Sequence, residues 1–193
     1  MSTIGIIIGS TRPNRRGADI GAWVQEAAAR RDDASFVLID LRDFSLPHFD
    51  QAIPPAMGGT QSESAKAWAN AIGECDGFIF VTAEYNQWLP GALKNAIDFV
   101  FAEWCNKAAG IVSYGAAGGL GAAGQLRQMC GQFGIADIPA QVRLTLEADF
   151  EDMSRFRPRA TSAAALDTML DQLTAWTSAM EPLRVAAPSA LVH

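Results

Sequence analysis

The segment with the most distinctive chemistry is Gly9–Gly17, which follows the apolar run 6–8. It offers two hydroxyl groups and three guanidinium groups, on Ser10, Thr11, Arg12, Arg15 and Arg16. A helical pattern begins at Ala18, so these groups would lie at a helix N-terminus, where free N–H groups and partial positive charge favour an anion. The loop lacks G-x-x-x-x-G-K-[ST], so it predicts a phosphate monoester site and not a nucleoside triphosphate loop. An ordinary turn capped by Ser or Thr, with solvated arginines, is the alternative.

A second loop follows the apolar run 77–82 directly and combines aromatic rings, amides and a carboxylate. Its residues of interest are Ala83, Glu84, Tyr85, Asn86 and Gln87, with Trp88 beyond them. Aromatic faces and amide groups suit a flat heteroaromatic ligand, which they can stack on and match at its edge. A subunit contact or a small satellite cluster of the core is the alternative, because Tyr and Trp are also enriched at interfaces.

A third loop follows the apolar run 108–114 and is rich in glycine. It supplies Ser113, Tyr114, Gly115, Gly118 and Gly119. Glycine lets the backbone approach a ligand edge closely, and it equally permits a tight turn with no ligand. The stretch 119–124 matches G-x-G-x-x-G, with Glu147 further on. We reject a dinucleotide site there, because that motif belongs to the first strand–helix–strand unit of a chain.

The three loops need a scaffold that brings them together, and the hydrophobic pattern supplies one. Strands are predicted at 3–9, 35–40, 77–82, 108–114 and 142–146, and helices at 18–30, 62–73, 90–101, 121–133 and 162–181. Continuous apolar strands separated by helices predict a parallel sheet covered on both faces, in one doubly wound α/β domain. Ligands of such sheets bind at the carboxyl ends of the strands, where all three loops lie.

Composition limits the classes of partner. The chain of 193 residues is 49% hydrophobic and has a net charge of -6, which argues against nucleic acid and makes the arginine loop a local positive spot. With no long apolar run and no leader pattern, we expect no membrane segment and no export. Three cysteines without C-x-x-C suit a cytoplasmic protein. Only His48 and His193 are present, so we expect neither a metal site nor a histidine triad.

Together the loops resemble the NADPH-dependent FMN reductase family. Segment 9–17 is similar to its G-S-x-R-x-x-R loop, segment 83–98 to its P-E-Y-N … P-x-x-L-K-N-A-I-D, and segment 113–119 to its S-x-G-x-x-G-G. Ala83 stands where the family usually has proline. The resemblance implies a flavodoxin-like three-layer αβα sandwich over residues 1–184, with a five-stranded parallel sheet in the order 2-1-3-4-5. Residues 185–193 are expected to form a flexible tail.

The resemblance also implies a cofactor and a set of roles. Loop 10–17 would hold the phosphate of FMN through Ser10, Arg12 and either Arg16 or Arg15. Loop 83–87 would line the isoalloxazine, and the glycine-rich loop its far edge. The protein would take hydride from NAD(P)H and reduce a small acceptor such as a quinone, an azo dye, chromate or free flavin. It would need no catalytic side chain of its own, because the chemistry belongs to the flavin.

Several further expectations follow. Glu84 is expected to order its loop or contact the ring, and Lys94 and Asp98 to form a helix-face ion pair. A homodimer or homotetramer is expected through helix 90–101, whose apolar residues exceed what one sheet face needs. Two other functions stay open: an FMN-binding electron carrier that does not use nicotinamide, and a non-catalytic interaction protein on the same scaffold.

Overall fold

A five-stranded parallel sheet forms the centre of the computed structural model, which describes residues 1–58 and 62–186. Its strands are β1 (Ser2–Ile8), β2 (Ala34–Asp40), β3 (Gly77–Ala83), β4 (Ala108–Gly115) and β5 (Ala136–Thr145). They are hydrogen bonded in the order β2-β1-β3-β4-β5, which confirms the flavodoxin-like prediction. The direction of strand addition reverses between β1 and β3, so a crevice is expected at their carboxyl ends.

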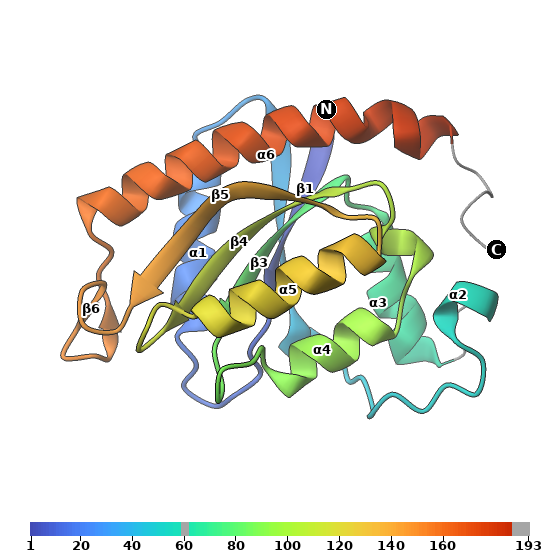
Figure 1. Ribbon diagram of the computed structural model, residues 1–193, viewed down its shortest axis with the longest axis horizontal. Coiled ribbons are helices and arrows are strands. Elements are labelled where there is room, and N and C mark those ends of the chain that lie inside the picture. The colour runs from blue at the N-terminus through green and yellow to red at the C-terminus, as the bar shows by residue number, and fades with distance from the viewer. Residues whose placement is uncertain (59–61, 187–193) are drawn as a thin grey trace.

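Helices cover both faces of the sheet (Figure 1). They are α1 (Gly17–Ala28), α2 (Pro55–Gly58), α3 (Glu63–Gly73), α4 (Gly91–Asp98), α5 (Leu120–Gln132) and α6 (Ala160–Ala186), with short 3-10 turns η1 (Leu41–Asp43) and η2 (Ala102–Trp104). One apolar cluster joins α1 and α6 to the sheet, and a second joins α3, α4 and α5 to the opposite face. The three layers follow from strands that are apolar on both sides and must be covered on both.

Helix α4 ends at Asp98, earlier than the predicted Phe101, because two tryptophans take its last carbonyl groups. The indole N–H of Trp68 donates to the Ala96 carbonyl at 2.7 Å, and that of Trp104 donates to the Ile97 carbonyl at 3.1 Å. The chain then turns, which places Phe99 in the core at 0% exposure.

This packing overturns the reason for expecting a subunit contact along that helix. The apolar side chains at positions 93, 97, 99, 100 and 104 are all at most 3% exposed in the single chain. Phe101 is half-buried and lies with its ring centroid 5.5 Å from that of Phe133. The surplus apolar surface of this segment therefore stabilises the subunit's own core.

The C-terminal part departs most from the sequence prediction. Strand β5 begins at Ala136, ahead of the predicted residue 142, and includes Pro139, which an edge strand tolerates because one side of it makes no ladder bonds. A small antiparallel pair, β6 (Phe150–Glu151) and β7 (Arg155–Phe156), was not predicted. Helix α6 is longer than the predicted 162–181 and includes residues 185 and 186 of the expected tail. The rest of that tail, 187–193, lies outside the described residues.

Candidate functional site

The loop after β1 ends at an uncapped helix. Arg16 occupies the N-cap position of α1 and its side chain makes no capping hydrogen bond. Within the described chain, no backbone carbonyl accepts a hydrogen bond from the N–H groups of residues 11, 12 and 14–16. The structure therefore differs from the alternative of a turn capped by Ser or Thr. It leaves a set of free donors at the positive end of a helix, which is the arrangement that binds anions.

The three arginines of this loop have different surroundings. Arg12 is exposed, and its guanidinium carbon lies 5.5 Å from the centroid of the Tyr85 ring. Arg16 is half-buried and forms no ion pair with any described residue. Arg15 is turned inward, with its side chain 7% exposed, and is paired with Asp40. Two of the three positive charges are thus free for a ligand.

The loop after β3 is fixed at both ends. The Tyr85 hydroxyl is hydrogen bonded to the buried Ser10 hydroxyl at 2.6 Å, which links this loop to the loop after β1. Tyr85 and Trp88 exchange backbone hydrogen bonds of 2.8 and 3.1 Å around a two-residue turn. The turn residues, Asn86 and Gln87, both have positive φ, which is typical of the tight turns that join antiparallel segments. Ala83 is the last residue of β3, pairs with Tyr114 and is buried.

Glu84 joins the loop after β3 to the start of α5. Its Oε2 accepts hydrogen bonds from the N–H of Gly121 at 2.7 Å and the N–H of Ala122 at 3.4 Å. A Cβ atom on Gly121 would lie 2.5 Å from the Gln87 carbonyl oxygen, so only glycine allows this approach. The geometry agrees with a loop-ordering role for Glu84, because its carboxylate supplies the acceptor that the N-cap of α5, Gly119, cannot provide.

The loop after β4 is held by its own serine. Ser113 Oγ donates to the Gly118 carbonyl at 2.6 Å and accepts from Gln141 Nε2 at 3.0 Å, so this hydroxyl is already occupied. Gly118 and Gly119 adopt positive φ values of 78° and 71°, which the turn into α5 requires. Tyr114 is buried, and burial, with a smaller contribution from Tyr85, raises its pKa to about 12, so the phenol stays protonated. Gly115 ends β4 and is half-buried.

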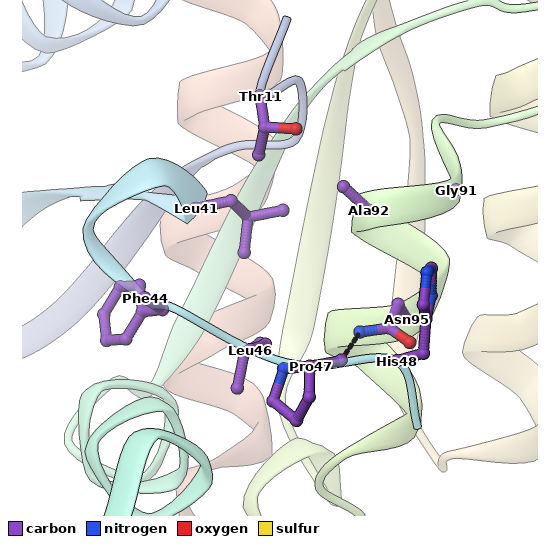
Figure 2. Close-up of a pocket in the computed structure, with 9 residues that line it drawn as sticks. All are labelled: Thr11, Leu41, Phe44, Leu46, Pro47, His48, Gly91, Ala92 and Asn95. Atoms are coloured by element: carbon purple, nitrogen blue, oxygen red, sulfur yellow. Dashed lines mark hydrogen bonds between the residues drawn. The ribbon is translucent and has the colours of Figure 1, made fainter. Parts of the chain in front are cut away.

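A cleft of about 400 Å³ adjoins the first loop (Figure 2). It is lined by Thr11, Leu41, Phe44, Leu46, Pro47, His48, Gly91, Ala92 and Asn95. The Asn95 amide holds the segment after η1 against α4: its Nδ2 donates to the Pro47 carbonyl at 2.8 Å, and its Oδ1 accepts from the Phe49 N–H at 2.8 Å. The sequence analysis missed this segment, because it considered only the loops after β1, β3 and β4. Its apolar residues directly after β2 were the available signal.

The free donors, with two arginines that form no ion pair with any described residue, suit a phosphate, and most of the chain matches one family model. The model described as NADPH-dependent FMN reductase covers residues 2–149. The chain belongs to the NADPH-dependent FMN reductase family. No described helix is long and apolar enough to cross a membrane, and in the same residues no group of His, Cys, Asp and Glu could hold a metal ion.

Relatives and solved structures agree with this membership. An NAD(P)H-dependent FMN reductase of Schizosaccharomyces pombe is 40% identical over 147 residues, which is 75% of this chain and 73% of that protein. A 2-hydroxy-1,4-benzoquinone reductase of a Burkholderia species is 27% identical over 187 residues, covering 90% and 94% of the two chains. The NAD(P)H:(acceptor) oxidoreductase flavoenzyme of Paracoccus denitrificans superposes with a TM-score of 0.71 at 22% identity, covering 93% and 99%. These similarities confirm the fold expected of an FMN reductase.

Proposed function

We propose that this FMN reductase binds FMN with its phosphate at the N-terminus of α1 and passes electrons from NAD(P)H to a small quinone. The observation that carries the proposal is the uncapped start of α1 beside two arginines that form no ion pair with the residues the structure describes. A helix N-terminus binds a phosphate through its N–H groups, and a guanidinium adds charge-assisted hydrogen bonds. The donor set therefore fits a phosphate monoester.

The described residues contain parts that would bind and orient such a cofactor. Tyr85 offers an aromatic face beside the phosphate loop, Trp88 is exposed near it in the same turn, and the backbone of Gly121 closely approaches that of Gln87. When bound, FMN supplies the hydride and electron chemistry, so the chain needs no acid–base pair of its own. The open face beside Tyr85, where Trp88 exposes an aromatic surface, suits an uncharged flat ring such as a quinone.

A purified sample tests this function. We expect a yellow protein with a flavin spectrum, release of FMN on denaturation, and steady oxidation of NAD(P)H when benzoquinone is added. An FMN-binding electron carrier would show the spectrum without steady oxidation. A non-catalytic interaction protein would stay colourless after soaking in FMN, and either of these results would refute the proposal.

Arg12→Ala tests the phosphate assignment. Loss of one charge-assisted hydrogen bond should weaken FMN binding roughly 10- to 150-fold, and excess FMN should restore activity. Arg30→Ala, at an exposed position after the far end of α1, is the matched control and should leave the affinity unchanged. Equal affinities of the two variants would remove Arg12 from the site.

We also propose a cytoplasmic homodimer. Three free cysteines support a reducing compartment. Exposed apolar side chains at Phe49, Ile53 and Met57 offer a contact surface that the buried α4 segment does not. Sedimentation at micromolar concentration should give twice the mass of the chain, and a monomer with full flavin content would contradict the dimer.

A further inference from the structure

The inward-facing arginine of the first loop is held by three hydrogen bonds. Arg15 Nη1 donates to the Ser10 carbonyl at 2.8 Å and to Asp40 Oδ1 at 2.8 Å, and Nη2 donates to Asp40 Oδ2. The side chains are 7% and 19% exposed, so solvent screens the pair little. Bidentate pairing of this kind fixes the guanidinium in both position and orientation.

The backbone explains how Arg15 comes to point inward. Asn14 has a φ of 53°, and this left-handed residue reverses the loop just before Arg15. Asp40 is the last residue of β2 and pairs in register with Ile8, the last residue of β1. Asp40 Oδ1 also accepts from the Arg42 N–H at 2.9 Å. The ion pair therefore joins the loop after β1 to the end of the neighbouring strand.

We infer that Arg15 is a positioning residue braced by Asp40, and that Arg12 and Arg16 supply the charge that binds the phosphate; this rests on the proposed function of the site. The Arg15–Asp40 pair is neutral as a unit and adds little field at the loop. Three of its five N–H groups are used in these bonds, and Nε is buried with no hydrogen-bond partner among the described residues, so a ligand does not reach Nε while the loop keeps this conformation. The pair instead occupies the Ser10 carbonyl and holds the loop in the form that leaves its N–H groups free.

Asp40→Asn separates the two possible roles of Arg15 by the sign of its effect. If Arg15 bound the phosphate, removal of its counter-charge would tighten FMN binding, because a negative charge near the anion is lost and a guanidinium is released. If Arg15 instead only holds the loop in place, Asp40→Asn should weaken FMN binding, because a loop that has lost this ion pair must be reordered when FMN binds. We expect FMN to bind about 10-fold more weakly in a fluorescence titration of the apoprotein. Unchanged or tighter binding would overturn the inference.

Salt dependence gives a second readout. Arg16→Ala should weaken FMN binding roughly 10- to 150-fold and reduce the dependence of affinity on salt, because a charge facing the anion is removed. Arg15→Lys, which keeps the pair neutral, should weaken binding while the salt dependence stays that of the wild type. A salt dependence in Arg16→Ala equal to that of the wild type would overturn the assignment.

The melting temperature of the FMN-free protein tests whether the Arg15–Asp40 pair holds the loop, and this test does not depend on the proposed function. Asp40→Asn and Arg15→Lys should melt below the wild type, whereas Arg16→Ala should melt with it. Asp171→Asn, which removes an exposed carboxylate in α6 that also pairs with an arginine, is the matched control and should change the melting temperature little. A wild type that binds no FMN would refute the function alone, and unchanged melting of both brace variants would refute the brace.

Discussion

The hydroxyl groups of Ser10 and Tyr85 are hydrogen bonded at 2.6 Å, although the residues are 75 positions apart in the chain. The bond joins the loop proposed to hold a phosphate to the loop proposed to hold an aromatic ring. Because Ser10 is fully buried, the bond anchors the Tyr85 side chain just after β1. Phosphate binding and ring binding should therefore depend on each other.

Tyr85→Phe should weaken both the fold and the cofactor site. The variant leaves the buried Ser10 hydroxyl without this partner, which should cost about 1 kcal/mol of unfolding free energy. FMN affinity should fall roughly five-fold, which corresponds to a similar free energy. Urea denaturation of the apoprotein and FMN titration measure the two quantities. An unchanged FMN affinity would show that the two loops bind independently.

Variants of Glu84 should affect stability more than turnover. Glu84→Ala removes the acceptor at the start of α5 and should cost about 1–2 kcal/mol, whereas Glu84→Gln keeps an acceptor and should cost less. With FMN bound, Glu84→Gln should turn over at close to the wild-type rate. A fall of roughly 100-fold in this variant, the size of a lost proton-transfer step, would instead assign Glu84 an acid–base role.

NAD(P)H and a quinone should follow ping-pong kinetics. Both would use one open face beside Tyr85 and the exposed Trp88, so each must leave before the other binds. Tyr114, which is expected at the far edge of the ring, is buried. Double-reciprocal plots should give parallel lines at several quinone concentrations. Intersecting lines would require a ternary complex and a second binding position.

A fall in pH should reduce the stability that Asp149 contributes through its hydrogen bonds at the start of α6. Burial alone would raise the pKa of this fully buried carboxylate, but hydrogen bonds from Ser162, Arg159 and the Thr145 N–H outweigh it and lower the pKa. A lowered folded pKa contributes stability above the unfolded pKa, and this is lost as the pH falls through the folded value. Asp149→Asn should therefore cost about 2 kcal/mol at pH 7 and progressively less as the pH falls below the ordinary value of 3.8. A cost independent of pH in urea denaturation would contradict this.

A rise in pH should increase the contribution of Lys107 to the stability of the folded protein. Its buried ammonium donates to the Ile72 carbonyl at 2.8 Å, yet burial lowers its pKa from 10.5 to about 8. The folded protein then binds fewer protons than the unfolded chain between these values, so this group's contribution to stability rises with pH across that window. The wild type should gain stability relative to Lys107→Met between about pH 7.5 and pH 9.5. A constant difference between the two proteins would show that Lys107 keeps its proton.

The sequence alone determined the layered fold and the three loops that form the site. Strands β1, β3 and β4 read as continuous apolar runs because both their sides are buried, and each ends in a loop of unusual composition. Glycine, hydroxyl and arginine residues at the start of a helix indicate an anion site, although Ser and Thr also occur there as ordinary caps. Local pattern was sufficient here because the signal lies within single elements.

Only the tertiary structure decided which side chains face the ligand and which hold the loops. Arg15 and Arg16 are adjacent and chemically identical, but a carboxylate 25 residues away turns the first inward and leaves the second free. Likewise α4 ends where the indoles of Trp68 and Trp104 reach its carbonyl groups, and its apolar residues are buried in the subunit itself. These outcomes depend on contacts between residues distant in sequence. A local sequence pattern carries no information on the free energies of such contacts.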